Sequence, residues 1–194
     1  ISYSQPFRLD VFCENTFFHE VSVPDYPLFE YTPYELNLTS KLVDVVRHEN
    51  LNLLHVHYAI PHASAAVQAK NILETYGISI PIVTTLHGTD ITLLGKDKSF
   101  KPVIEYAINK SDAVTAVSED LIKETNSHFS IKNEIMMISN FIDLNLYSQK
   151  IDENLRLKIA KKEEKILVHI SNFRKVKRVM DVLKIYNEVQ KKIP

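Results

Sequence analysis

Short hydrophobic runs alternate with amphipathic stretches along most of the chain. Apolar residues recur at helical spacing in 34–49, 61–76, 102–109 and 119–125, and each stretch is predicted to be a helix. Ser118 is the predicted N-cap of the last of them. Short apolar runs predict strands at 17–23, 52–57, 82–87, 113–117 and 134–138. The run at 52–57 has no clean alternation, which is typical of a strand buried on both faces of a parallel sheet.

Strand and helix alternate about every 25–30 residues, which indicates βαβ units in a doubly wound α/β sheet. A polar stretch interrupts this series, and a further predicted strand at 165–171 and a helix from about Val179 come after it. We therefore predict a Rossmann-like domain at residues 1–145, a linker at 146–164, and the first βα unit of a second Rossmann-like domain at 165–194.

Composition excludes several classes of protein. The chain is 45% hydrophobic and 24% charged, which argues against disorder, and no apolar run is long enough for a membrane-spanning helix. A net charge of -1 argues against nucleic acid as a partner. The single cysteine, Cys13, excludes an internal disulfide and fits a cytoplasmic protein. The sequence leaves a homo-oligomer open.

Ligands of open parallel sheets bind beyond the carboxyl ends of the strands. His87-Gly88-Thr89-Asp90 lies at such an end, where Gly88 permits a tight turn and Thr89 and Asp90 can cap the next segment of the chain. The alternative is a strand-to-helix turn in which the histidine has no role. Asn140 lies just after another predicted strand.

Three histidines lie close together in the chain, at His55, His57 and His62. A metal site is disfavoured, because neither a cysteine nor a nearby carboxylate completes a ligand set. The favoured interpretation is a group of strand-end histidines that form hydrogen bonds with the backbone or with a ligand.

A basic segment comes after the predicted strand 165–171, with its charges at Arg174, Lys175, Lys177 and Arg178. It leads into a helix, whose N-terminal N–H groups favour anions, so this segment suits a diphosphate. The alternative is a solvated basic loop.

The chain resembles the retaining glycosyltransferases of family four, which have two Rossmann-like domains (the GT-B fold), and within them the members of the bacillithiol pathway. The segments that carry the resemblance are 6–9 (PFRL), 23–31 (VPDYPLFEY), 55–63 (HVHYAIPHA), 84–92 (TTLHGTDIT) and 169–178 (HISNFRKVKR).

The resemblance implies transfer of N-acetylglucosamine from UDP-N-acetylglucosamine to L-malate, with retention at the anomeric carbon and with no metal or other cofactor. It implies that His87 is the catalytic residue that contacts the donor sugar. Lys177 corresponds to the lysine that binds the donor diphosphate. Asn172 stands where the family has an arginine, and Arg174 is expected to supply that charge. Ser171 and Gly88 complete the expected donor side.

On the acceptor side, the resemblance implies Tyr58, Thr89 and Asn140. Lys98 and Lys101 are further candidates for the carboxylates of the acceptor, because they come after the H-G-T-D turn. A sugar or an inositol phosphate is the alternative acceptor.

The resemblance also implies that the chain is cut at both ends. The first strand of the family and its glycine-rich loop would precede Ile1, and the paired glutamates that hold the donor would lie beyond Pro194. We therefore expect the 194-residue chain alone to be nearly inactive. A non-catalytic binding module built on half of the fold is the remaining alternative.

Overall fold

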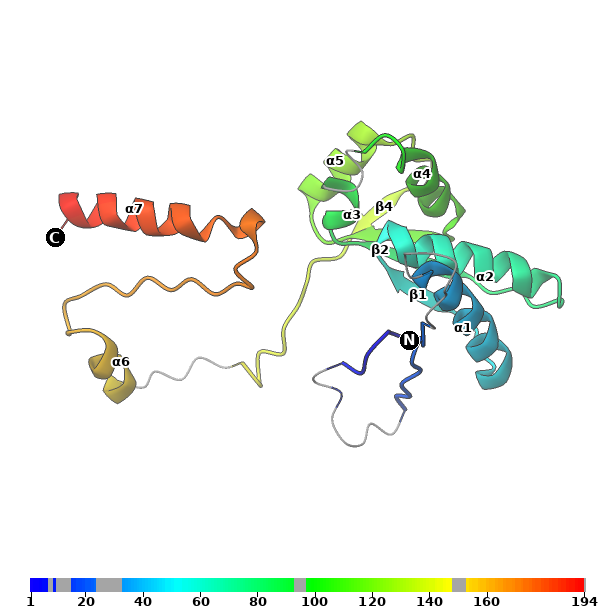
Figure 1. Ribbon diagram of the computed structural model, residues 1–194, viewed down its shortest axis with the longest axis horizontal. Helices are drawn as coiled ribbons and strands as arrows, with labels where there is room; N and C mark the ends of the chain where they lie inside the picture. The colour runs from blue at the N-terminus through cyan, green and yellow to red at the C-terminus, as the bar shows by residue number, and fades with distance from the viewer. Residues whose placement is uncertain (7–8, 10–14, 24–32, 93–96, 148–152, 194) are drawn as a thin grey trace. The chain divides into compact units, whose positions relative to one another are not determined.

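The computed structural model describes residues 1–6, 9, 15–23, 33–92, 97–147 and 153–193 (Figure 1). The chain divides into two compact units, residues 1–141 and 142–194. The first unit contains α1 (Tyr34–Glu49), β1 (Leu54–His57), the helical turn η1 (Ala59–Ala63), α2 (Ser64–Glu74), β2 (Ile82–Leu86), α3 (Thr89–Thr92), α4 (Lys101–Lys110), β3 (Ala113–Ala116), α5 (Glu119–His128) and β4 (Ile135–Met137). The second unit contains α6 (Glu153–Ile159), the 3-10 turn η3 (Lys175–Lys177) and α7 (Val179–Lys192).

Four parallel strands form the sheet of the first unit, in the order β1-β2-β3-β4. The helices α2, α4 and α5 connect successive strands, so the unit is a series of βαβ crossovers. The register places His57 opposite Thr85, and Thr85 opposite Thr115. The predicted α/β fold with a Rossmann-like parallel sheet is therefore confirmed.

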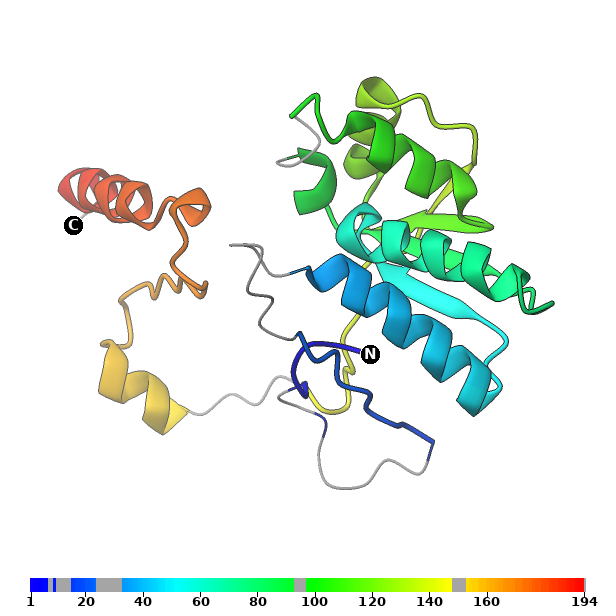
Figure 2. The same cartoon turned by 45° about the vertical axis from the view of Figure 1, so that its right-hand side comes forward.

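Helices cover one face of this sheet. Figure 2 shows α1 in blue and α2 in cyan-green lying side by side along it. In β1, Leu54 and Val56 are buried whereas His55 and His57 are exposed. The expectation that this strand is buried on both faces is therefore wrong for the described residues. The largest fully buried side chains of the unit are Leu73, Ile80, Ile82, Leu86, Ile91, Ile104 and Ile108.

The predicted helix starts are close to the observed ones. The predicted helix at 34–49 coincides with α1, and the predicted N-cap of α5 is confirmed, since the Ser118 hydroxyl accepts a hydrogen bond from the Leu121 N–H at 3.2 Å. The short helix α3 and the helix α6, which lies inside the predicted linker, are not predicted by the sequence pattern. Cys13 and most of the segments 6–9 and 23–31 lie outside the described residues.

Two predicted strands do not form. Residues 17–23 contain only an isolated parallel bridge between Ser2 and Glu20. Residues 165–171 are not paired with any described segment, and the rest of the described second unit is helical or irregular. Both segments have the composition of strands, but a strand also needs a neighbour for its backbone hydrogen bonds.

The second unit buries little of its own apolar surface. None of its described residues is fully buried, and the apolar side chains of α7 are exposed or nearly so. One βα segment cannot enclose a hydrophobic core. None of the described helices is both long and apolar enough to cross a membrane.

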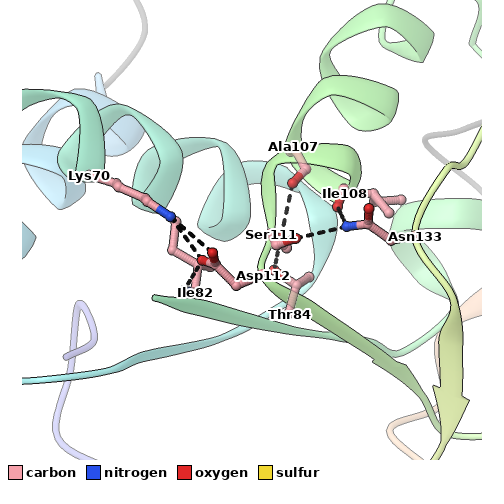
Figure 3. Close-up of polar contacts among 8 residues, drawn as sticks. All are labelled: Lys70, Ile82, Thr84, Ala107, Ile108, Ser111, Asp112 and Asn133. Atoms are coloured by element: carbon pink, nitrogen blue, oxygen red, sulfur yellow. Dashed lines mark hydrogen bonds and ion pairs between the residues drawn. The ribbon is translucent and has the colours of Figure 1, made fainter. Parts of the chain in front are cut away.

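Polar contacts tie together the loops at the amino ends of the strands, as Figure 3 shows. The Asp112 carboxylate, just before β3, accepts a hydrogen bond from the Ile82 N–H at 2.7 Å. It also lies 2.9 Å from the Lys70 ammonium of α2. Partial burial raises the pKa of Asp112, but Lys70 and the Ile82 N–H outweigh it, and the pKa lies below its ordinary value of 3.8. Asp112 therefore links α2, β2 and β3 through its ionised form.

Ser111 and Asn133 extend this network toward β4. The Ser111 hydroxyl donates to the Ala107 carbonyl at 3.0 Å and lies 2.7 Å from the Thr84 hydroxyl, which therefore donates to it. The Asn133 amide donates to the carbonyls of Ile108 and Ser111, at 3.1 and 2.7 Å (Figure 3). The segments that begin β2, β3 and β4 are thus bonded to one another.

Replacing Asp112 should make stability depend less on pH. Asp112→Asn keeps the shape but removes the charge that pairs with Lys70, so we expect a loss of about 1 kcal/mol in the free energy of unfolding at pH 7. Because folding lowers this pKa, the stabilisation is complete above the unfolded-state pKa of about 4 and disappears as pH falls through the lower folded-state pKa. Urea unfolding at several pH values should show the difference from wild type shrinking below about pH 4.

The control is Asp120→Asn, because Asp120 is 98% exposed and lies 3.9 Å from Lys123. This change should leave stability unaltered. Equal effects of the two substitutions, or an Asp112 effect independent of pH, would contradict the assigned role.

Candidate active site

The carboxyl ends of β1 and β2 bring two predicted site residues together. Tyr58 comes directly after β1 and His87 directly after β2, and the strands are parallel neighbours. The two ring centroids lie 5.1 Å apart. His87, Gly88 and Tyr58 are half-buried, whereas Thr89 is exposed. Side chains from two separate motifs thus form one surface beyond the sheet.

Asp90 bonds the two loops to each other. Its Oδ2 accepts a hydrogen bond from the Ala59 N–H at 2.8 Å, and its Oδ1 accepts one from the Gly88 N–H at 3.1 Å. Only 1% of Asp90 is exposed. A buried carboxylate is costly unless it is hydrogen-bonded, and these charge-assisted bonds compensate for its burial. The sequence predicts Asp90 only as a cap for the segment after it. The structure shows that it instead bonds to the loop after β1, which the sequence analysis did not predict.

Gly88 is required by its backbone conformation. Its φ is +110°, a region that side-chain-bearing residues rarely adopt. A Cβ atom would meet only the Leu121 side chain, at an ordinary contact distance of 4.0 Å. The expected tight turn is present, and it directs the Gly88 N–H toward Asp90.

Tyr58 holds a strained backbone conformation, with φ 76° and ψ 139°. Such a conformation costs about 1–3 kcal/mol in a non-glycine residue and persists only where surrounding contacts enforce it. Here the Tyr58 N–H donates to the Thr85 carbonyl at 2.9 Å, and the Tyr58 carbonyl accepts from the Ala63 N–H at 3.1 Å. With the bond from Ala59 to Asp90, these contacts fix the direction in which the chain leaves β1.

The strand-end histidines form hydrogen bonds with side chains on neighbouring elements. Nδ1 of His57 lies 2.8 Å from Nε2 of His87. Nε2 of His55 lies 2.8 Å from the Thr85 hydroxyl, which lies 2.8 Å from the Thr115 hydroxyl. The sequence indicates backbone or ligand partners, and it does not identify these pairs. Burial lowers the pKa of His57, and the neighbouring histidines lower it further, so His57 is neutral at pH 7.

His62 lies in η1, with its ring centroid 6.0 Å from that of Tyr58. Its ring meets that of Tyr34 edge-on at 6.2 Å, and its buried Nδ1 has no hydrogen-bond partner among the described residues. Burial lowers its pKa, although the His57 carbonyl, Asp90 and Glu35 act in the opposite direction. Within the described residues, no three histidine, cysteine or acidic side chains are grouped so that they could hold a metal ion.

The structure does not bring Asn140 to this cluster. It lies after β4, which is separated from β2 by β3, and its side chain is exposed. Among the described residues it makes no hydrogen bond to Tyr58 or His87. Lys101 lies 3.7 Å from Glu105 in the first turns of α4, so its charge is partly balanced there.

The predicted donor residues Ser171, Asn172, Arg174 and Lys177 belong to the second unit. The Ser171 hydroxyl accepts a hydrogen bond from the Phe173 N–H at 3.2 Å and lies 2.9 Å from a nitrogen of His169. Asn172, Arg174 and Lys177 are exposed.

One cation of the basic segment is already paired. Nε of Arg178 lies 2.6 Å from the Asp181 carboxylate in the first turn of α7. Arg174, Lys175 and Lys177 make no ion pair with any residue in the described part of the chain. These three side chains therefore carry the uncompensated positive charge of the segment.

Comparison with known proteins supports the glycosyltransferase family that the sequence motifs suggest. Residues 3–146 match Glycosyltransferase Family 4. N-acetyl-alpha-D-glucosaminyl L-malate synthase of Bacillus anthracis is 49% identical over 198 residues, which cover 100% of this chain and 51% of that protein. An uncharacterized glycosyltransferase of Methanocaldococcus jannaschii, MJ1178, is 27% identical over 136 residues, which cover 70% of this chain and 37% of that protein. The chain therefore spans about half the length of the first relative, and its match spans less than half of the second. From the match over most of its length, the chain belongs to Glycosyltransferase Family 4.

Proposed function

We propose that this chain is part of a retaining glycosyltransferase that transfers N-acetylglucosamine from UDP-N-acetylglucosamine to L-malate, the first step of bacillithiol biosynthesis. The observation that carries the proposal is the 49% identity, along the whole chain, to a protein named for that product. We assign the reaction to the cytoplasm, in agreement with the single cysteine of the sequence.

The loops after β1 and β2 are the proposed acceptor side. Tyr58 and Thr89 carry hydroxyl groups that can donate hydrogen bonds to the carboxylates of malate. His87 lies within ring contact of Tyr58 and would meet the sugar of the donor. Asn140 completes the acceptor side in this proposal, although it lies farther along the sheet edge.

The basic segment of the second unit is the proposed donor side, and residues 165–194 are the proposed start of the donor domain, after a domain at 1–145 and a linker at 146–164. Arg174 and Lys177 have no acidic partner in the described chain, so their charges remain for an anionic ligand. Ser171 and Asn172 precede them and offer polar groups for the diphosphate. Charges held near a leaving phosphate stabilise the negative charge that develops on it.

The proposed chemistry uses the donor itself as the base. The malate hydroxyl oxygen bonds to the anomeric carbon on the face from which UDP departs, while the bond from that carbon to the phosphate oxygen breaks. The hydroxyl proton passes to the departing diphosphate. The contribution of the protein is then position and charge, and positioning alone can supply about 7–11 kcal/mol in well-oriented systems.

The direct test is transfer by a form of the protein that spans the length of its relatives. UDP release from UDP-N-acetylglucosamine should require L-malate, and the product should have the α-configuration by proton NMR. Succinate is the control, because it has both carboxylates but no hydroxyl. We expect the 194-residue chain alone to be nearly inactive. Hydrolysis without an acceptor, or transfer to a sugar or inositol phosphate but not to malate, would contradict the proposal.

The basic segment can be tested separately in the same form. Lys177→Ala and Arg174→Ala should each lower kcat/KM by about 30- to 1,000-fold, which corresponds to the 2–4 kcal/mol typical of one preorganised electrostatic contact. Lys184→Ala is the control, since Lys184 is an exposed cation on the adjoining helix α7. If all three variants keep wild-type kcat/KM, the segment is a solvated surface.

Transfer should not depend on a metal ion. The clustered histidines are bonded to Thr85 and to one another, with no carboxylate or thiol partner for a metal among the described residues. We therefore expect steady-state rates to be unchanged after dialysis against EDTA. Loss of activity that added magnesium or zinc restores would show that a metal takes part.

A further inference from the structure

The proposed reaction leaves the hydrogen bond between His57 and His87 without a role. This bond joins Nδ1 of His57 to Nε2 of His87 across 2.8 Å, from the end of one strand to the end of the next. The rings are also in contact, with centroids 5.0 Å apart. One of these two nitrogens must carry the proton and the other must offer a lone pair.

This bond determines what His87 can offer to a ligand. If Nδ1 of His57 donates, Nε2 of His87 is the acceptor and its proton is on Nδ1. If Nε2 of His87 donates instead, its Nδ1 carries only a lone pair. In a neutral imidazole, the partner of one nitrogen thus sets the state of the other. No described residue forms a hydrogen bond with Nδ1 of His87.

The groups around the pair keep the His57 ring neutral. His55 lies on the same strand, with its ring 4.8 Å from that of His57, and His62 of η1 interacts electrostatically with His57. Burial and these neighbouring histidines lower the pKa of His57. The nearest carboxylate in the two loops, Asp90, accepts hydrogen bonds from Ala59 and Gly88. No acidic side chain in the described chain forms a hydrogen bond with either ring.

We propose that His57 is a positioning residue, which donates from Nδ1–H to Nε2 of His87 so that His87 presents an Nδ1–H donor to an oxygen of the sugar nucleotide. This inference rests on the proposed function only for the identity of the ligand that meets the Nδ1–H of His87, whereas the direction of the hydrogen bond is proposed for the free chain. The oxygens of an ionised diphosphate only accept hydrogen bonds. A lone pair at Nδ1 of His87 would repel them.

The strained loop after β1 supports this role. The ring of Tyr58 also contacts that of His87, with centroids 5.1 Å apart, so the imidazole meets the rings of both Tyr58 and His57. The ring plane is therefore restrained by packing and its tautomer by the hydrogen bond. Free neutral histidine prefers the proton on Nε2, so the proposed tautomer of His87 requires a donor at the position of His57.

The tautomer can be measured directly in the 194-residue chain, without any substrate. Two-bond and three-bond nitrogen-15 correlations from labelled histidine rings distinguish Nδ1–H from Nε2–H. We expect His87 to carry its proton on Nδ1 at pH 8. Assignment uses the loss of one set of signals in His87→Gln.

Three variants separate the hydrogen bond from packing. His57→Phe keeps a ring in contact with His87 but removes the donor, so His87 should shift to the Nε2–H form. His57→Asn places an amide N–H near the former Nδ1 and should restore the Nδ1–H form. His55→Ala is the matched control, because His55 lies two residues away on the same strand and forms a hydrogen bond with Thr85, not with His87. It should leave His87 unchanged.

The outcomes distinguish this inference from the proposed function. A wild-type His87 with its proton on Nε2, or an unchanged tautomer in His57→Phe with a native amide spectrum, overturns the role of His57.

In the form that spans the length of the relatives, His57→Phe should lower kcat/KM for UDP-N-acetylglucosamine by about 10- to 100-fold, and His57→Asn should recover most of the loss. The KM for malate should not change. Absence of UDP release by the wild type overturns the proposed function and the identity of the ligand, whereas the NMR result decides the role of His57 by itself.

Discussion

The buried carboxylate of Asp90 accepts hydrogen bonds from the N–H groups of Ala59 and Gly88, and much of the candidate site depends on this contact. These amides belong to loops that leave two different strands, so one side chain sets the distance between them. The strained backbone of Tyr58 precedes Ala59, and the positive φ of Gly88 lies two residues before Asp90 itself. The Tyr58 conformation would not be stable alone, because it costs energy that the surrounding hydrogen bonds must offset, whereas Gly88 adopts its positive φ without a side-chain clash. The position of the Tyr58 ring beside His87 results from both.

The fold could be predicted where its signals are local. Helical spacing in 34–49 predicted α1 to the residue, and the hydroxyl of Ser118 predicted the start of α5. The segments 17–23 and 165–171 failed for the opposite reason. Their apolar, β-branched composition favours an extended chain, but whether a strand forms depends on a partner elsewhere, which no local pattern encodes.

The site could be predicted only in part, for a related reason. The rule that ligands bind at the carboxyl ends of parallel strands correctly brought Tyr58 and His87 together. The same rule grouped Asn140 with them, because it gives the edge of the sheet but not the number of strands between two loops. The pairing of His57 with His87 depends on the register that sets His57 opposite Thr85. Register is a property of the assembled sheet, so the sequence motifs could name these histidines but not their partners.

The parallel sheet also gives the first unit two chemically separate edges. At the amino ends of the strands, Asp112 and Asn133 bond loop to loop, and at the carboxyl ends Asp90 does so beside the candidate site. Because all strands run in one direction, the two sets of loops lie a strand length apart. Selection for heat tolerance and selection for a new acceptor can therefore act on different loops of the same unit. A protein engineer could randomise one edge while the other keeps the sheet intact.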